Sequence, residues 1–402
     1  MGQQCARRVL KTAGKCKAKT GPYERILVIL GTRPEAIKLA PVVRELRRQS
    51  AFEVKVCVTG QHRQMLDQVL ELFNLAPDFD LNLMTANQHL NDLTAAIIHG
   101  MNDIFRRWRP DLALVQGDTT TTLGAGLASF YEKIPVGHIE AGLRTGNRSS
   151  PWPEEINRRL TTIVCTHHFA PTEAARRNLL RENVDPGSVL VTGNTVIDAL
   201  KEVLARIAQD KSLNAICEKE FSFLDVRRRL VLVTGHRREN FGEAFRRICM
   251  ALRELSTRDD AELVYPVHLN PNVRGPVHQM LAGVKNIHLL GPLEYMRFSY
   301  LLNRAHLIIT DSGGIQEEGT YLGKPVLVMR DTTERPEALE AGTAKLVGTH
   351  PMTIVAEAHN LLNDERSYRK MARPSNHFGD GFASERIGSY LKSLKGVAIA
   401  GI

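Results

Sequence analysis

Apolar runs rich in β-branched residues alternate with longer segments of helical periodicity along almost the whole chain. A strand buried on one face alternates apolar and polar side chains, whereas a strand covered by helices on both faces is apolar without interruption. The strand-like runs of the first half are mostly apolar rather than alternating, at residues 26–30, 54–58, 112–115 and 136–139. Helical patterns lie between them, at residues 35–48, 63–73, 90–108 and 120–131. This alternation predicts the α/β class with a doubly wound parallel sheet.

A second series of the same kind has strand-like runs at residues 230–234, 263–267, 287–290, 307–310 and 326–329. The chain has 402 residues, which is enough for two domains with separate cores. We therefore predict two Rossmann-like domains, an N-terminal one at 24–193 and a C-terminal nucleotide-binding one at 194–383. A helix and tail at 384–402 can pack on either domain, the N-terminal one included. Such domains turn the carboxyl ends of both sheets toward a shared cleft, where ligands bind.

The first 23 residues form a basic head with six Lys or Arg and no Asp or Glu, which contributes to the formal net charge of +9. No apolar run of the kind that a signal peptide needs follows these charges. We favour a disordered extension or an upstream start over a transit peptide. Because the rest of the chain is only mildly basic and 6% of all residues are aromatic, we expect no nucleic-acid binding. No run of about 18 apolar residues occurs, so we expect no transmembrane helix.

The sequence contains no pattern typical of a metal or a redox cofactor. Its six cysteines show neither a CxxC pair nor zinc-site spacing, which is typical of reduced thiols in a cytoplasmic protein. His167 and His168 are adjacent, so their rings would point to opposite sides of a strand. His236 and His268 lack a spaced carboxylate partner. The motifs GxGxxG, GxxxxGK[ST] and GxSxG are not found at the strand ends, so we expect no cofactor and no serine-hydrolase triad.

Polar clusters follow three strands of the first half. Residues 31–38 form a glycine turn before a helix start, whose backbone N–H groups and positive dipole end favour an anion, with Arg33 and Lys38 adding charge. A plain turn with solvated side chains is the alternative reading. Asp118 and Glu140 each follow an apolar strand, although an aspartate there can also simply cap the next helix.

Glu154 follows a stiff Pro-Trp-Pro segment at the start of another helix. We expect Asp118, Glu140 and Glu154 to converge on the cleft. Mutual repulsion and burial would then raise some of their pKa values, as acid–base chemistry requires.

The second half supplies matching parts. His236 follows its first strand and is a candidate acid, base or phosphate ligand. The run from Ser312 to Gly314 opens a helix after strand 307–310, which suits a diphosphate by the same dipole argument. Glu318 lies about two turns into that helix, where it can take the two hydroxyls of a ribose, and Arg335 adds a cation near the same edge. A purely structural reading of this cluster remains open.

Eight strings carry a resemblance to a known family. In chain order they are GTRPEAIK, GDTTTT, VGHIEAGLRT, PWPEE, TGHRREN, PVHLNP, DSGGIQEE and RDTTERPE. In this order they resemble the non-hydrolysing UDP-N-acetylglucosamine 2-epimerases, and the match runs from about residue 25 to the C-terminus.

The resemblance implies a glycosyltransferase-B-like fold, a cytoplasmic homodimer and no metal or nicotinamide. It implies reversible conversion of UDP-GlcNAc to UDP-ManNAc, a precursor of cell-surface polysaccharide. The implied route is anti elimination of UDP to give 2-acetamidoglucal, followed by syn re-addition of UDP.

The resemblance also implies roles for individual residues. The implied catalytic residues are Asp118, Glu140, Glu154 and His236. The implied substrate contacts are Arg33, Lys38, Phe298, Ser312, Gly313, Gly314, Glu318 and Arg335. A candidate activator site comprises Gln61, His62 and Gln64. Two positions depart from the family pattern: Leu293 replaces a frequent Gln beside the uracil, and Asn87 replaces an Arg near the activator site.

Three alternatives share this fold and substrate. A hydrolysing 2-epimerase would release UDP and free ManNAc from the same intermediate. A glycosyltransferase would need an acceptor and would show no epimerisation without one. A non-catalytic UDP-sugar sensor would gain nothing from the carboxylates Asp118, Glu140 and Glu154 near a diphosphate, which argues against it.

Overall fold

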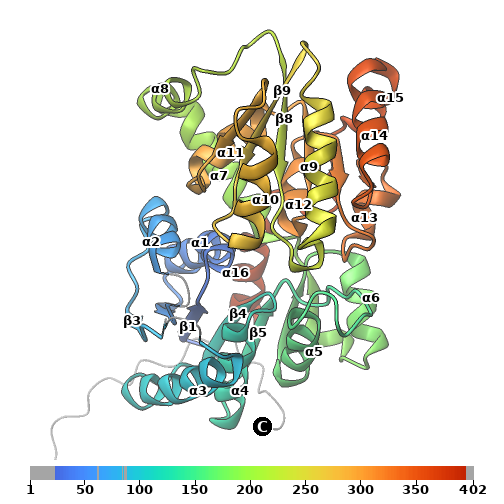
Figure 1. The fold of residues 1–402 in the computed structure, drawn as a ribbon. Coiled ribbons are helices and arrows are strands. Elements are labelled where there is room, and N and C mark those ends of the chain that lie inside the picture. Colours follow the sequence, from blue (N-terminus) through green and yellow to red (C-terminus); the bar gives the residue numbers. More distant parts are fainter. Residues whose placement is uncertain (1–22, 61–62, 84, 86–87, 395–402) are drawn as a thin grey trace, which may run out of the picture.

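The computed structural model describes residues 23–60, 63–83, 85 and 88–394, and Figure 1 shows its two sheets with their helices. The first sheet has seven parallel strands in the order β3-β2-β1-β4-β5-β6-β7. Its strands are β1 (Arg25–Leu30), β2 (Glu53–Val58), β3 (Phe79–Asp80), β4 (Leu112–Gln116), β5 (Val136–Ile139), β6 (His167–Ala170) and β7 (Val189–Val191). Its helices are α1 (Arg33–Arg48), α2 (Arg63–Leu72), α3 (Leu90–Arg107), α4 (Thr120–Tyr131), α5 (Glu154–Val164) and α6 (Glu173–Arg181), with the 3-10 turn η1 (Pro186–Ser188).

The second sheet has six parallel strands in the order β10-β9-β8-β11-β12-β13. Its strands are β8 (Arg229–Thr234), β9 (Ala261–Pro266), β10 (Ile287–Leu290), β11 (Leu307–Thr310), β12 (Val326–Val328) and β13 (Ala344–Leu346). Its helices are α9 (Glu243–Leu255), α10 (Pro271–Leu281), α11 (Tyr295–Arg304), α12 (Gly313–Tyr321), α13 (Pro336–Glu340), α14 (Pro351–Asn363) and α15 (Glu365–Met371), with the 3-10 turn η2 (Arg238–Asn240). The predicted class, two doubly wound parallel sheets, is confirmed.

The central strands are mostly apolar because both of their faces are buried. In β1, Ile26 and Val28 belong to one core cluster, whereas Leu27 and Ile29 belong to another on the opposite face. β8 divides in the same way. Val231 and Val233 belong to one core cluster, and Leu230 and Leu232 belong to another on the opposite face. Each sheet is therefore a middle layer between two layers of helices, as the sequence pattern predicts.

Three helices connect or extend the two domains. α7 (Thr195–Gln209) and α8 (Lys211–Glu220) lead from the first sheet to the second, and α16 (Ala383–Ser393) ends the described chain. α7 packs against α1 as well as against α11 and α12. Figure 1 shows α16, in red, beside α1, and its residues Ile387 and Leu391 are buried in the core cluster of β1. The C-terminal helix thus completes the N-terminal core.

The chain crosses between the domains twice, and the two crossings touch. Asn194 N donates to Phe378 O at 2.6 Å. Gly193 has a φ of +88°, and a Cβ there would lie 2.9 Å from Gly379 Cα. Glycine is needed here both for the left-handed backbone and for the close approach.

In the part of the chain that the structure describes, no helix combines the length and the apolar character that a bilayer span requires.

Candidate active site

The predicted site residues of the N-terminal domain lie at the carboxyl ends of its strands, but the start of α1 differs from the prediction. The N–H groups of Gly31 and Thr32 donate to Glu35 Oε2 at 2.9 and 2.7 Å. Thr119 Oγ1 donates to Glu35 Oε1 at 2.6 Å. The carboxylate of Glu35 therefore occupies the N–H groups that we predicted to bind an anion, and that prediction is wrong for these two groups. Only side chains such as Arg33 remain for a ligand.

Glu140 follows β5 directly, with a positive φ of 67°. Its Oε2 accepts hydrogen bonds from Lys38 Nζ and, at 2.8 Å, from Gln116 Nε2, and its Oε1 lies 3.6 Å from Arg335 Nη2. Burial by itself would raise the pKa of Glu140, but the charges of Lys38 and Arg335 outweigh burial and hold the pKa below its usual range. The expectation of a raised pKa is therefore wrong for this carboxylate.

Asp118 follows β4 and is held by residues of α5. Its Oδ2 accepts from Arg158 Nη2 at 2.5 Å, and its backbone O accepts from Asn157 Nδ2 at 3.0 Å. Burial would lower the pKa of Arg158, but Asp118 and the neighbouring glutamates outweigh this effect and raise it. Because Glu154 is the first residue of the same helix, α5 brings two of the three predicted carboxylates into one corner.

Glu154 differs from the other two carboxylates in having no cation partner. Its Oε2 is buried, and no hydrogen-bond donor among the described residues reaches it. A buried carboxylate oxygen without a donor costs free energy unless a ligand or proton engages it. This oxygen therefore lacks a partner that a proton or a ligand group would supply.

The start of α12 has the geometry expected of an anion site. Ser312 is its N-cap, and Gly313 and Gly314 are its first residues. A Cβ on Gly313 would lie 2.7 Å from Arg335 Cζ, whereas no described atom lies within 4 Å of the same position on Gly314. Gly313 thus lets Arg335 pack against the helix, and Gly314 faces open space. The first N–H groups of a helix have no intrahelical acceptor, so they can bind a diphosphate.

Glu318 lies at the boundary between the domains. Its Oε1 accepts from Tyr295 OH at 2.7 Å, and Arg33 Nη2 of the N-terminal domain donates to Leu293 O at 2.8 Å. Burial, with the nearby Glu317, raises the pKa of Glu318 to about 7. Burial lowers the pKa of Arg33, although the phenol of Tyr295 and the carboxylate of Glu318 oppose that shift. Glu318, predicted to bind the ribose, and Arg33, predicted to contact the substrate, therefore lie close together at the domain boundary.

Arg335 joins the two halves of the site. Its Nε donates to Glu317 Oε1 at 2.5 Å, its Nη1 pairs with Glu334, and its Nη2 faces Glu140. Burial would lower the pKa of Arg335, but these carboxylates, Glu317 first, outweigh burial and raise it. The structure thus brings Lys38, Glu140 and Arg335 together across the domain boundary.

His236 follows β8 at the other side of the C-terminal site. Its backbone N donates to both oxygens of the buried Asp311, at 3.1 and 2.9 Å, and its ring stacks on His268 with centroids 5.4 Å apart. The side chain of His236 is 41% exposed. Desolvation by the surrounding protein, together with the cation Arg237, lowers its pKa, and the carboxylate of Asp311 opposes this shift. No hydrogen bond or ion pair among the described residues links His236 to the carboxylates of the N-terminal domain.

Some of the remaining predicted residues lie within the part of the chain that the structure describes, and others lie outside it. Phe298 is half-buried on α11 and packs with Leu293 and Ile315 against the third core cluster. Gln61, His62 and Asn87 lie outside the described residues, as do residues 1–22 of the basic head, and of Gln64 only the helical backbone in α2 is described. Tyr23, the last residue of the predicted head, is buried in the N-terminal core. Within the described ranges, no group of three or more His, Cys, Asp or Glu side chains is arranged to hold a metal ion.

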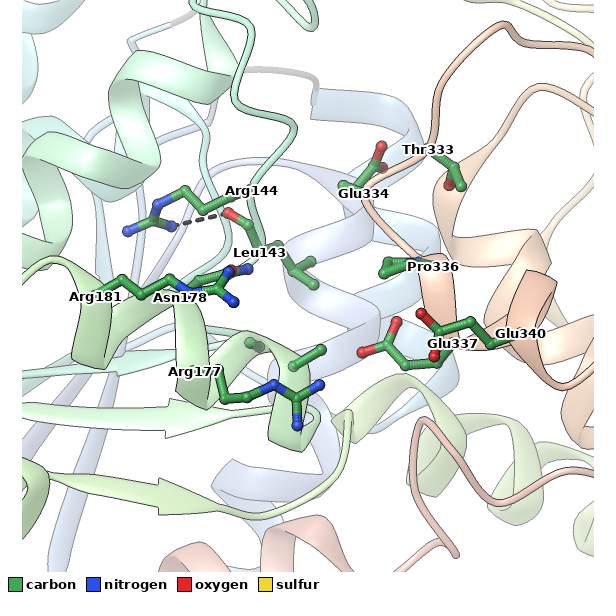
Figure 2. Close-up of a pocket in the computed structure, with 12 residues that line it drawn as sticks. Leu143, Arg144, Arg177, Asn178, Arg181, Thr333, Glu334, Pro336, Glu337 and Glu340 are labelled. Atoms are coloured by element: carbon green, nitrogen blue, oxygen red, sulfur yellow. Dashed lines mark hydrogen bonds between the residues drawn. The ribbon is translucent and has the colours of Figure 1, made fainter.

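A cavity of about 230 Å³ lies beside this site rather than in it. Figure 2 shows Arg144, Arg177 and Arg181 on one wall, which belongs to the N-terminal domain. Three glutamates of the C-terminal domain, residues 334, 337 and 340, form the facing wall. None of the predicted site residues lines this cavity, and its nearest link to them is Glu334, the partner of Arg335.

Sequence reasoning missed the residues that hold the predicted ones in place. Arg158 holds Asp118, Tyr295 holds Glu318, and Glu317 holds Arg335. Arg158 had a usable signal, because it stands four residues after Glu154 and so shares its helix face. The other two had none, because their partners come from distant segments.

Known proteins that are similar to this chain identify its family. The family model described as UDP-N-acetylglucosamine 2-epimerase matches residues 44–392. A probable UDP-N-acetylglucosamine 2-epimerase of Ralstonia nicotianae is 56% identical over 368 residues, which are 90% of this chain and 97% of the relative. The UDP-N-acetylglucosamine 2-epimerase of Escherichia coli K12 is 55% identical over 370 residues, 92% of this chain and 98% of the relative.

A solved structure of another family member has a similar fold. The UDP-GlcNAc 2-epimerase of Neisseria meningitidis, in a crystal structure with bound UDP-GlcNAc, superposes with a TM-score of 0.90 at 50% identity, over 92% of this chain and all of that chain. The sequence strings, the two parallel sheets and these matches agree. The chain belongs to the UDP-N-acetylglucosamine 2-epimerase family.

Proposed function

We propose that this chain interconverts UDP-GlcNAc and UDP-ManNAc without releasing the free sugar. The contact between Arg335 of the C-terminal domain and Glu140 of the N-terminal domain, at 3.6 Å, carries the proposal. It places a cation suited to a diphosphate beside a carboxylate, so that departure of UDP and movement of a proton occur in one site.

The chemistry follows from the acidity of the sugar. The C2 proton is not acidic, so the C1–O bond breaks ahead of its removal, and the electron pair goes to the β-phosphate oxygen of UDP. Arg335, Lys38 and the start of α12 stabilise the charge on that oxygen. A carboxylate takes the C2 proton, which leaves a C1–C2 double bond in 2-acetamidoglucal. Re-addition of UDP at C1 with a proton at the other face of C2 gives the epimer.

We assign the proton transfers to the set Asp118, Glu140 and Glu154, with His236 on the other side of the site. The carboxylates are not equivalent. Glu140 is paired with cations that favour its ionised form, whereas Glu154 has an oxygen that no described donor engages. This contrast in partners supports different roles for the two carboxylates in the proton transfers.

Burial supports the non-hydrolysing reaction. Glu140, Glu317 and Arg335 are all buried where the domains meet. A site that excludes water holds UDP and the glucal together until they recombine. A hydrolysing enzyme would instead admit water to the same intermediate.

Product analysis tests the proposal. Purified protein is incubated with UDP-GlcNAc without added metal, and the products are separated by ion-exchange chromatography. We expect UDP-ManNAc in equilibrium with UDP-GlcNAc and no accumulation of free sugar. Free ManNAc with UDP would assign the chain to the hydrolysing kind, and an unchanged substrate that still binds would favour a sensor or an acceptor-dependent transferase.

We further propose a homodimer that buries an apolar face of α4 and α5. These helices pack side by side, and their exposed residues include Phe130, Tyr131, Leu160 and Ile163, the last being 77% exposed. A second copy would cover this face. Ile163→Glu should shift the protein from dimer to monomer in light scattering; a dimer unchanged in mass would place the interface elsewhere.

We also propose a cytoplasmic location, because all four cysteines in the described ranges are free thiols. The resemblance to the family supports a role for the product in cell-surface polysaccharide synthesis.

A further inference from the structure

Asn194 stands at the crossing between the domains and forms hydrogen bonds through its backbone and through both polar atoms of its side chain. Its backbone N donates to Phe378 O of the second crossing at 2.6 Å. Its Oδ1 accepts from Val196 N at 3.2 Å and so caps α7. Its Nδ2 donates to Glu317 Oε2 at 2.5 Å. The crossing is therefore bonded directly to α12 of the C-terminal domain.

Glu317 carries this connection to the reacting groups. Its side chain is 0% exposed, so substrate does not reach it in this arrangement. One oxygen accepts from Asn194 and the other from Arg335 Nε, each at 2.5 Å. Arg335 in turn faces Glu140 at 3.6 Å. An unbroken series of polar contacts thus joins the crossing to the centre of the site.

A simple structural role does not explain this arrangement. A helix cap needs only the Oδ1 of Asn194, and a salt bridge to Arg335 needs only one oxygen of Glu317. The Nδ2–Oε2 bond between them adds a buried contact between the crossing and the active arginine. A guanidinium held on one side by a fixed carboxylate cannot turn away from the position where the diphosphate oxygen gains charge.

We propose that Asn194 and Glu317 are positioning residues that set the orientation of Arg335 according to the state of the crossing between the domains. This inference rests on the proposed function in treating Arg335 and Glu140 as groups of the reacting site. Because these bonds tie Arg335 to the crossing, any movement of the crossing would change the direction in which Arg335 points toward the departing UDP.

A reciprocal exchange tests the proposal. Asn194→Asp keeps the oxygen that caps α7 but removes the Nδ2 donor to Glu317. Glu317→Gln added to it supplies a donor from the other side, so that the bond is remade in the opposite direction at unchanged net charge. Asn214→Asp is the matched control, because it breaks an exposed amide–glutamate bond of the same type, to Glu218.

We expect Asn194→Asp to lose about 10- to 100-fold in kcat/KM, mostly in kcat, because Arg335 acts on charge that grows in the transition state. The exchanged double variant should recover most of this loss, although each substitution alone is harmful. Asn214→Asp should stay within about twofold of the parent protein. Full activity of Asn194→Asp would overturn the proposal, and so would a double variant as slow as the single one with an equally lowered Tm.

Binding of UDP, measured by calorimetry on the same proteins, separates this proposal from the proposed function. If the parent protein binds UDP but does not epimerise UDP-GlcNAc, the proposed function fails. The positioning role is then judged on affinity: Asn194→Asp should weaken UDP binding about tenfold and the double variant should restore it. Equal affinity of all three proteins for UDP would contradict it.

Discussion

The N-terminal domain brings two of its three predicted carboxylates to the site paired with cations, whereas the C-terminal domain brings a helix start that faces open space. Glu140 accepts from Lys38, and Asp118 accepts from Arg158. On the other side, Gly314 at the start of α12 faces open space. From this difference we infer a division of labour: proton transfer depends mainly on the carboxylates of the N-terminal half, and diphosphate binding depends mainly on the helix start of the C-terminal half.

The same division appears in how each helix start is used. At α1, the carboxylate of Glu35 takes the N–H groups of Gly31 and Thr32. At α12, the first turn carries two glycines and no acidic residue. A helix start that is filled by its own glutamate stabilises the fold, and one that is left open can bind a phosphate. The sequence predicts an anion site at both turns. We infer that only the turn at α12 binds one, because Glu35 fills the turn at α1.

The largest effect should come from the N-terminal half. Asp118→Asn removes a carboxylate but keeps the shape that accepts from Arg158. We expect turnover of UDP-GlcNAc to fall about 1000-fold with little change in UDP affinity, because acid–base groups contribute that much to rate and little to binding. Steady-state kinetics and calorimetry measure the two effects. Asp103→Asn, a neutralisation on the exposed face of α3, is the control. An equal loss of affinity and rate would break the division of labour.

The second prediction compares two neighbouring glycines of the C-terminal half. Gly313→Ala places a Cβ against the guanidinium of Arg335, so we expect the ligand-free protein to lose about 1–3 kcal/mol of stability. Gly314→Ala adds its methyl to open space and should leave the ligand-free Tm unchanged while weakening UDP binding. Thermal unfolding with and without UDP measures both. Identical behaviour of the two variants would show that Gly314 does not face the ligand.

The third prediction concerns pH and Glu318. Burial raises the pKa of this carboxyl from 4.5 to about 7, so it is mostly protonated at pH 6 and mostly ionised at pH 8 in the free protein. Only the ionised form accepts hydrogen bonds from both ribose hydroxyls. Binding of UDP-GlcNAc, whose diphosphate does not titrate in this range, should therefore tighten about tenfold between pH 6 and pH 8.

The effect of pH on stability has the opposite sign. A folded-state pKa above the unfolded value means that the folded protein binds the proton more tightly, so the contribution of Glu318 to stability is full below pH 4.5 and is lost as the pH rises through 7.

The predicted pH dependence of UDP-GlcNAc affinity is measured by calorimetry in an Asp118→Asn background, which prevents turnover. Glu318→Gln should flatten the dependence; a slope that persists in this variant would point to another titrating group.

The elements themselves were largely predictable from sequence. α4, β5, β10 and β11 begin and end at the predicted residues. Apolar strands covered on both faces leave a clear pattern, and glycine or proline marks many of the turns between them. The strand-end positions of Asp118, Glu140 and Ser312 followed from the same pattern, because ligands bind at the carboxyl ends of parallel strands.

The contacts that tune the site were not predictable in the same way. The lowered pKa of Glu140 depends on Lys38 and on Arg335, which lie 102 and 195 positions away in the chain. The bond from Asn194 to Glu317 spans 123 positions. Local periodicity carries no information about such pairs. Glu35 is a different case, since a Thr followed three residues later by Glu is the signature of a capping box. That signature competes with the anion-site reading of the same turn.

The proposed mechanism requires one site that removes and returns the C2 proton of a bound UDP-sugar. Proton NMR of UDP-GlcNAc with the purified protein in deuterated water, without added metal, tests it most directly. We predict UDP-ManNAc and recovered UDP-GlcNAc that both carry deuterium at C2, in a mixture that stops changing at equilibrium. Epimerisation with the C2 proton fully retained, or no epimerisation of bound UDP-GlcNAc, would contradict the account.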